Sequence, residues 1–250
     1  MIISTEISKS SRSQHLKQAI EKMSAPEKKI VMLDIDRQVD FVEGGALAVT
    51  DGLAAIVATN KIIHDDTLKI SRVFKTQDWH PKNHVSFAVN NEGAKVFSEL
   101  EIELPDKTKV IQVMWPLHCV ENTKGAEFHP AVVDNPKIPT EVIPKGTNPR
   151  ADSYSGFGCA RQGVDEKTEL NDKLCAMKAT HVIVAGLAED FCVAYTAKDA
   201  ILRGYKVCVP LYATRPVSPV SSAKERALMT AMGVVLANTP EELKAWVDAA

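Results

Sequence analysis

Four side chains that could take part in covalent catalysis follow short apolar runs of the chain. Asp36 follows residues 29–33, Asp78 follows 70–74, Lys145 follows 141–143 and Cys192 follows 181–185. Apolar runs of this length are typical of buried strands, and the carboxyl ends of parallel strands meet at one edge of a sheet. Cysteine, aspartate and lysine brought together there would make a nucleophile with a base and an electrostatic partner.

Cys192 lies where a strand is expected to pass into a helix. The free N–H groups and the dipole at the start of a helix favour a thiolate over a thiol. The backbone N–H groups of Ala188 and Cys192 could stabilise an oxyanion formed when the sulfur attacks a carbonyl. Two alternatives stay open: Cys192 could be an ordinary buried cysteine, or the nucleophile could be Cys119, which adjoins His118.

A thiol also needs a group that accepts its proton. A carboxylate in a partly dry crevice can have its pKa raised enough to serve, and Asp36 is the residue that we expect in this role. Lys145 would hold Asp36 in place and favour the thiolate. Asp34 is an alternative to Asp36, because residues two apart on a strand point to the same face.

A second cluster predicts a metal site. Asp78 and His80 form a D-x-H pair whose side chains point the same way on an extended chain, and Pro81 turns the chain so that His84 can return to the same point. His118 offers a further imidazole. One carboxylate with imidazoles suits one divalent ion, with zinc preferred and manganese or iron possible by ligand type. The alternative is a solvated loop with incidental histidines.

Aromatic residues accompany these polar clusters. Phe41, Trp115 and Phe191 lie close to them in the sequence, and a flat aromatic substrate could stack among such rings. Together with Leu187, they form the expected substrate-binding set. Ordinary core packing is the alternative for each of them.

The elements that must position these residues alternate between strand and helix. This alternation predicts an α/β fold with a mostly parallel sheet covered on both faces. Helices are expected after Asp51, which could act as an N-cap, over 221–232, and after Thr239, which begins a capping box. Residues 79–144 lack periodicity and are expected to form binding loops. Residues 1–27 are expected to be an N-terminal extension with a helix over 13–23, and 28–250 a single domain.

Composition narrows the function classes. The 250 residues carry a net charge of −2, which gives no electrostatic reason to expect nucleic acid or an anionic membrane as a partner. Five cysteines without a C-x-x-C pair favour a reducing compartment, and the N-terminus lacks the apolar core of a signal peptide. We therefore expect a cytoplasmic protein that acts on a small molecule.

Several motifs in a fixed order carry a resemblance to a known family. They are DRQVDF at 36–41, GGALAV at 44–49, TQDWHP at 76–81, WPLHCV at 115–120, GAEFHP at 125–130, DSYSGF at 152–157 and GLAEDFCV at 186–193. Through these motifs, residues 29–237 resemble nicotinamidases of the cysteine-hydrolase, or isochorismatase-like, superfamily.

The resemblance implies a Rossmann-like three-layer α/β/α sandwich. It also implies an amidohydrolase that converts nicotinamide to nicotinate and ammonia through a cysteine thioester. Asp36, Lys145 and Cys192 would be its triad, and the ligands of its metal would be Asp78, His80, His84 and His118. A cis peptide bond between Leu187 and Ala188 is expected as well, and homo-oligomers are common among such folds.

Three other functions remain open at this stage. The same fold could hydrolyse another small amide or a carbamoyl compound. The metal could activate water while Cys192 is structural. The protein could also bind a metal or nicotinamide without catalysis.

Overall fold

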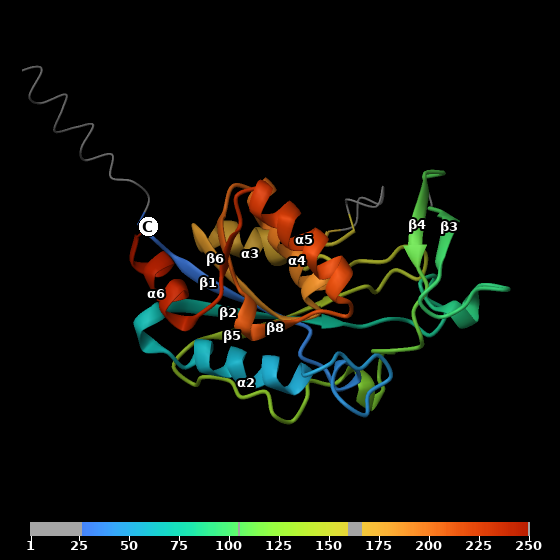
Figure 1. The fold of residues 1–250 in the computed structure, drawn as a ribbon, viewed down its shortest axis with the longest axis horizontal. Helices are drawn as coiled ribbons and strands as arrows, with labels where there is room; N and C mark the ends of the chain where they lie inside the picture. The colour runs from blue at the N-terminus through green and yellow to red at the C-terminus, as the bar shows by residue number, and fades with distance from the viewer. Residues whose placement is uncertain (1–26, 105, 160–166, 250) are drawn as a thin grey trace, which may run out of the picture.

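The protein is built around a seven-stranded sheet in which every pair of neighbouring strands is parallel (Figure 1). The computed structural model describes residues 27–104, 106–159 and 167–249. The strand order is β5-β2-β1-β6-β7-β9, and β8 pairs with β6. The strands are β1 (Ile30–Ile35), β2 (Ile70–Asp78), β5 (Thr140–Lys145), β6 (His181–Leu187), β7 (Lys206–Pro210), β8 (Thr214–Arg215) and β9 (Val235–Ala237).

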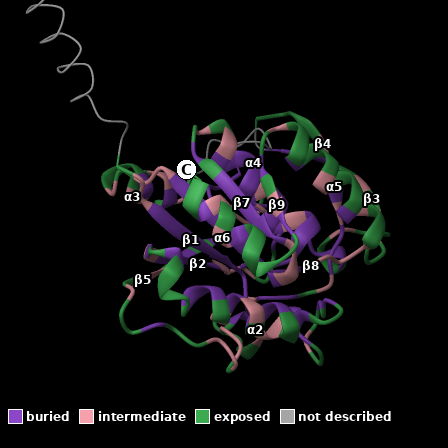
Figure 2. Ribbon diagram, turned by 60° about the vertical axis from the view of Figure 1, so that its left-hand side comes forward, coloured by how far each residue is buried: buried purple, intermediate pink, exposed green. Residues whose placement is uncertain are grey.

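Side chains of the central strands alternate between two hydrophobic clusters, one on each face of the sheet. On β1, Met32 belongs to the cluster under α2 (Gly52–Ile63) and α6 (Pro240–Ala249). Its neighbour Leu33 belongs to the cluster under three other helices, which are α3 (Leu170–Ala176), α4 (Ala194–Leu202) and α5 (Pro219–Ala231). Strand β1 is buried along its length (Figure 2), and every residue of β6 is buried as well, as expected for a covered parallel sheet. The predicted three-layer α/β/α architecture is confirmed.

Side chains cap the starts of α6 and α5 but not that of α2. The Thr239 hydroxyl accepts a hydrogen bond from the N–H of Glu242 at 3.2 Å, so Thr239 caps α6. Ser218 caps α5 in the same way through the N–H of Val220. The prediction that Asp51 caps α2 is wrong: its side chain makes no cap bond, because the residue is in the left-handed region with a φ of 56°.

The long region predicted to be irregular contains an antiparallel hairpin. Strands β3 (Glu99–Glu103) and β4 (Lys109–Val113) pair outside the main sheet. The alternation of glutamate with Leu100 and Ile102 is a strand signal that the sequence analysis did not use. The hairpin matters for the site because Gln112 on β4 is buried against it.

The N-terminal part of the chain was the subject of two predictions. The helix predicted over 13–23, and with it the N-terminal extension, lies outside the described residues and stays a prediction.

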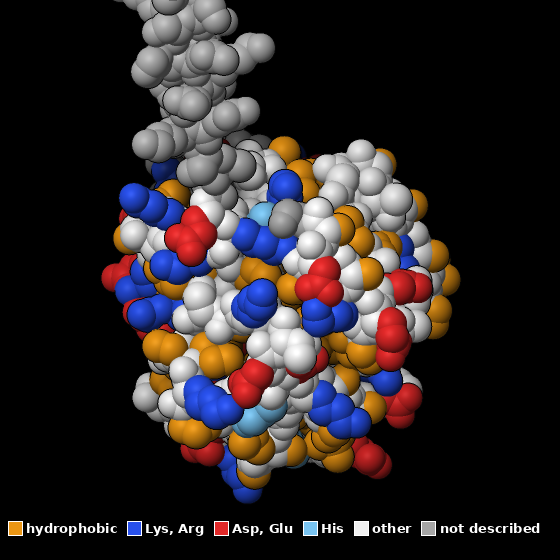
Figure 3. Space-filling view, turned by 90° about the vertical axis from the view of Figure 1, so that its left-hand side faces the viewer, with side chains coloured by type: hydrophobic (Ala, Val, Ile, Leu, Met, Phe, Trp, Pro, Cys, Tyr) orange, Lys and Arg blue, Asp and Glu red, His pale blue; other side chains and the backbone are white. Residues whose placement is uncertain are grey.

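No helix in the part of the chain that the structure describes is both long and apolar enough to cross a bilayer. On the end of the molecule shown in Figure 3, basic side chains are interspersed with acidic ones.

Candidate active site

The predicted reactive residues meet at the carboxyl ends of four adjacent strands, β5, β2, β1 and β6. Asp78 and Lys145 are the last residues of β2 and β5 and pair in register. Asp36 follows the end of β1 directly. Cys192 lies on a π-helical turn, Glu189–Val193, between β6 and α4. The sheet order therefore places the four side chains next to one another.

Lys145 stands at the centre of this group. Its ammonium nitrogen Nζ lies 3.0 Å from Oδ2 of Asp36 and donates a hydrogen bond to Sγ of Cys192 at 3.4 Å. It also donates to Asp78 and to the carbonyl of Ser153. All these side chains are buried. Sulfur, acid and amine are thus in direct contact, as the order of the strands led us to expect.

The protonation states follow from burial and from Lys145. Burial raises the pKa of Asp36 to about 6, although Lys145 opposes the shift. Burial would lower the pKa of Lys145, but Asp36 and Asp78 raise it well above its ordinary value, so the amine stays charged. Burial also raises the pKa of Cys192 well above its ordinary value, and Lys145 only partly offsets this. The resting sulfur is therefore a thiol, where the sequence analysis expected the helix start to favour a thiolate.

The structure separates Asp36 from its alternative. Asp34 forms a buried ion pair with Arg37, in which Nε and Oδ1 are 2.5 Å apart. Asp36 instead accepts a hydrogen bond from the hydroxyl of Thr76 at 2.7 Å and faces Lys145. The two side chains do not point to the same face, because β1 ends at Ile35 and Asp36 leaves the strand conformation with a φ of 43°.

The alternative nucleophile, Cys119, lies apart from this group. It is fully buried and packs in a hydrophobic cluster, with its Sγ 3.9 Å from the carbonyl of Gly125. It is not among the described residues that line the cavity around Cys192.

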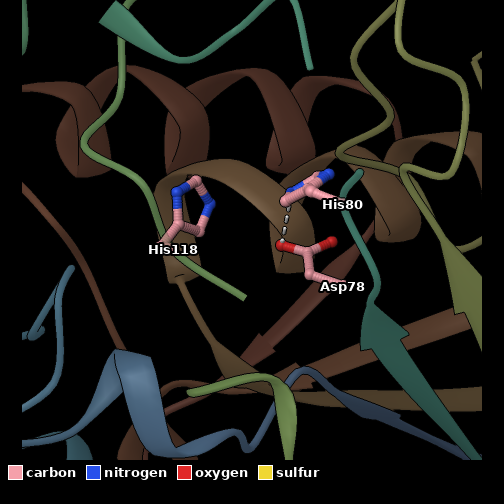
Figure 4. A group of neighbouring side chains, drawn as sticks. All are labelled: Asp78, His80 and His118. Atoms are coloured by element: carbon pink, nitrogen blue, oxygen red, sulfur yellow. Dashed lines mark ion pairs between the residues drawn. The ribbon is translucent and has the colours of Figure 1, made fainter. Parts of the chain in front are cut away.

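Three of the four predicted metal ligands form one compact group. Ligand atoms of Asp78, His80 and His118 all lie within 4.8 Å of one another, and all three residues are buried (Figure 4). In His80 and His118, Nδ1 lies 2.8 Å from a backbone carbonyl, of Gly146 and Pro116 respectively. This contact fixes each ring and leaves Nε2 for a metal.

Gly146 allows the close approach to His80. It has a φ of 64°, and a side chain at this position would collide with the imidazole. The residue after Lys145 therefore helps to seat the ring of His80.

His84 joins a second group that shares His80. Its ligand atom lies within 4.8 Å of those of His80 and Asp152, a residue that the sequence analysis did not select. Its Nδ1 lies 2.7 Å from the Ser86 hydroxyl, and its Nε2 is buried without a hydrogen-bond partner among the described residues. Burial lowers the pKa of His84 and of His118 to about 4, so both rings are neutral at pH 7. An unpaired, neutral, buried imidazole nitrogen fits a divalent cation.

A cavity joins the two clusters. Cys192 and Ala188 line it on one side and the metal group on the other. Three of the four residues that we expected to contact a substrate line its walls: Phe41, Trp115 and Phe191. The walls also include three residues that we did not predict: Leu47, Tyr154 and Val217. The rings of Trp115 and Phe191 meet edge to face at 4.8 Å.

Leu187 does not line this cavity, in contrast to our expectation. Its side chain is fully buried in the hydrophobic cluster that contains Ala55 and Ile56 of α2. The peptide bond that follows it, to Ala188, is cis. The oxyanion role of the Ala188 and Cys192 N–H groups stays a prediction.

Several supporting residues were not identified from the sequence. The Gln38 side chain accepts from the N–H of Asp78 and donates to its carbonyl, which fixes the backbone of this residue. Thr76 orients Asp36 through its hydroxyl. Both residues lie within motifs quoted above, but only their contacts in the fold reveal their roles.

Two buried carboxylates anchor the turn that carries Cys192. Glu189 forms a bidentate pair with Arg226 of α5, with distances of 2.7 and 2.9 Å. Asp190 accepts from the N–H groups of Val217 and Ser218 at 2.8 and 3.0 Å. The turn is therefore attached both to α5 and to the loop whose Val217 lines the cavity.

This arrangement agrees with a comparison of the whole sequence with known families. The isochorismatase domain matches residues 31–241, which is most of the chain. The chain belongs to the isochorismatase family. The family match contains all the residues of both clusters, from Asp36 to Cys192.

Relatives of this isochorismatase-family protein share both sequence and fold. The nicotinamidase of Escherichia coli strain K12 is 39% identical over 208 residues, which cover 82% of this chain and 92% of the relative. A yeast nicotinamidase bound to the inhibitor nicotinaldehyde superposes with a TM-score of 0.79 at 28% identity and covers 84% of this chain and 100% of its own. A pyrazinamidase of Pyrococcus horikoshii in complex with zinc has a TM-score of 0.67 at 30% identity, and covers 84% and 99%.

Proposed function

We propose that this protein is a nicotinamidase, which hydrolyses nicotinamide to nicotinate and ammonia with Cys192 as nucleophile. Lys145 contacts both Cys192 and Asp36, and Cys192 lines one cavity together with Asp78, His80 and His118; this arrangement is the observation that carries the proposal. Relatives with the name nicotinamidase, at up to 39% identity over most of the chain, support the choice of substrate. The aromatic walls of the cavity suit a pyridine ring.

The buried thiol sets the order of the chemical steps. Asp36 takes the proton of Cys192, and Sγ attacks the carboxamide carbon. The N–H groups of Ala188 and Cys192 stabilise the oxyanion. Asp36 then gives the proton to the leaving ammonia as the C–N bond breaks and a thioester remains. Water that loses its proton to Asp36 attacks the thioester, and nicotinate leaves as the thiol reforms.

Lys145 lowers the electrostatic cost of these steps. Its ammonium group contacts both the sulfur and Asp36, so it stabilises negative charge on either of them. It holds no proton that the reaction must move, since its pKa stays well above its ordinary value.

The residues of the metal group fit one divalent cation, and we propose zinc. The buried, unpaired Nε2 of His84 and the oriented rings of His80 and His118 support this assignment, together with Asp78. The zinc-bound pyrazinamidase relative supports the choice of metal. When bound, the cation would supply a Lewis acid that can anchor a ring nitrogen of the substrate.

The direct test is to incubate the purified protein with nicotinamide and to measure ammonia, with metal analysis of the same sample. A panel of other small amides and carbamoyl compounds measures specificity. We expect turnover of nicotinamide to exceed that of amides without a ring nitrogen. Metal or nicotinamide binding without ammonia release would reject the enzyme, and equal turnover across the panel would reject the substrate.

Two variants separate thiol chemistry from activation of water by the metal. Cys192→Ala is expected to abolish ammonia release while the metal stays bound. If the metal activated water and Cys192 were structural, Cys192→Ala would keep most of its rate, whereas His80→Ala would lose nearly all of it.

A further inference from the structure

Asp152 lies among the imidazoles of the metal group, although it was not among the predicted metal ligands. One of its carboxylate oxygens is within 4.8 Å of the ligand atoms of His80 and His84. The residue is buried and lines the same cavity as Asp78 and His118. Asp152 is therefore placed to act on whatever the imidazoles bind.

The hydrogen bonds of Asp152 are those of an ionised carboxylate. Oδ1 accepts from the N–H of Ser153 at 2.8 Å, and Oδ2 accepts from the side-chain amide of Gln112 at 3.0 Å. Both donors are neutral, and no lysine or arginine in the described part of the chain forms an ion pair with this carboxylate. A buried carboxylate without a cationic partner is costly, which calls for a cation at this point.

The formal charges around the cavity define the size of the deficit. Three buried carboxylates, of Asp36, Asp78 and Asp152, face one buried ammonium group, that of Lys145. With the imidazoles of His80, His84 and His118 neutral, as metal ligands must be, three negative charges and one positive charge leave a formal charge of −2. A divalent cation would neutralise this charge, whereas without Asp152 the deficit would be a single charge.

We infer that Asp152, which shares a group with His80 and His84, is a further part of the divalent cation site and contributes its carboxylate to holding the ion. The inference rests on the proposed function only in assuming that the imidazole cluster binds a divalent cation. Gln112 would orient the carboxylate from the β3–β4 hairpin, so this hairpin would support the metal site.

The test is the affinity for Zn²⁺, measured by competition with a chromophoric chelator. Asp152→Asn is compared with Asp36→Asn, which removes the same charge beside the neighbouring Lys145 and lies outside both imidazole groups. Loss of a residue in or next to the ligand shell costs about 10- to 100-fold in affinity. We expect a loss of this size for Asp152→Asn and only a small loss for Asp36→Asn. The rise in melting temperature on adding Zn²⁺ should shrink in parallel.

Two results would overturn the inference. Equal losses in the two variants would mean that Asp152 acts only through its net charge, and an unchanged affinity in Asp152→Asn would mean that it does not act on the cation. If Asp152→Asn does not fold, Gln112→Leu replaces it, because it removes the amide donor without changing the charge. A measurable loss of Zn²⁺ affinity would then support the inference, and an unchanged affinity would overturn it.

Failure of the inference can be told apart from failure of the proposed function. Ammonia release by the unmodified protein tests the function alone. Zn²⁺ affinity of the Asp152→Asn variant tests the inference alone, because this readout does not depend on turnover.

Discussion

Lys145 donates a hydrogen bond to Asp78, so the amine of the proposed triad is bonded directly to a carboxylate of the metal group. The two residues end neighbouring strands and pair in register. Burial would raise the pKa of Asp78, but Lys145 and His80 lower it far below its ordinary value. The nucleophile and the metal group therefore share one electrostatic environment, and several predictions depend on this coupling.

Replacement of Lys145 by methionine should impair turnover without loss of the metal. The variant removes the charge that stabilises the sulfur and Asp36, and the loss of one preorganised donor costs about 10²- to 10³-fold in rate. Asp78 stays available as a ligand. Steady-state kinetics and metal analysis test both statements. Lys75→Met is the matched control. Lys75, on β2, is also a buried lysine in an ion pair, in this case with Asp134, and it does not line the cavity. A similar loss in both variants would contradict the proposed role.

The two buried cysteines near the metal group should behave differently. Cys192→Ala should lower kcat by about 10⁴-fold or more, as for other essential nucleophiles. Cys119→Ala removes a thiol of similar burial that does not line the cavity, and it should keep most of the activity. Alkylation by iodoacetamide, followed by mass spectrometry of tryptic peptides, should report Cys192 as the site whose modification parallels inactivation. If Cys119→Ala lost its activity and Cys192→Ala kept it, Cys119 would be the nucleophile.

Activity should depend on pH with a limb near the pKa of Asp36. Burial raises this pKa to about 6, and the carboxyl group must be ionised to accept the proton of the thiol. We therefore expect kcat/KM to fall as the pH drops below about 6 and to be level above it. A profile between pH 5 and 8, with the metal content checked at each point, measures the limb. If the residual activity of Asp36→Asn still falls below about pH 6, the pH dependence belongs to another group.

Asp34 and Asp36 should separate stability from activity. Asp34→Asn leaves Arg37 buried with no carboxylate partner, and breaking such a pair costs about 3–5 kcal/mol of the free energy of unfolding. Asp36→Asn should change this free energy by less than about 1 kcal/mol, since Asp78 still balances Lys145, but it should lower turnover by about 10⁴-fold. Urea denaturation and kinetics on the same two proteins give the comparison. The inverse pattern would identify Asp34 as the base.

Loss of an imidazole from the metal group should cost both metal and activity. His118→Ala removes one of three ligand atoms that lie within 4.8 Å of one another. We expect its metal content after dialysis to fall well below that of the unmodified protein, with ammonia release falling in proportion. His64→Ala, at the exposed end of α2, should keep both. Full activity of His118→Ala without metal would contradict the site.

Much of the fold was predictable because strand signals and reactive residues coincide in the sequence. Each apolar run corresponds to a strand of the parallel sheet, and the residue types at the strand ends indicated where the clusters would form. Parallel strands need no turn chemistry to set their register, so this inference required only that the runs be neighbours. They are: β5, β2, β1 and β6 lie side by side.

The remaining features depend on contacts that no local pattern encodes. Asp152 reaches the imidazoles only because the chain after β5 folds back over the cavity, and Gln112 reaches Asp152 from a separate hairpin. Leu187 was expected in the pocket, but its side chain packs toward α2. The pKa of Cys192 depends on its degree of burial, which outweighs the helix start and is a property of the whole fold.

The reacting groups and the aromatic wall of the cavity lie on different parts of the fold, and this affects how its specificity can change. Lys145 and Asp78 are held by backbone pairing of adjacent strands, whereas Phe41, Trp115 and Phe191 come from segments outside the sheet. Substitutions in those segments can reshape the ring-binding wall and leave the spacing of the reacting groups intact. New amide specificities are therefore best sought at these three aromatic positions, with the strand ends held constant.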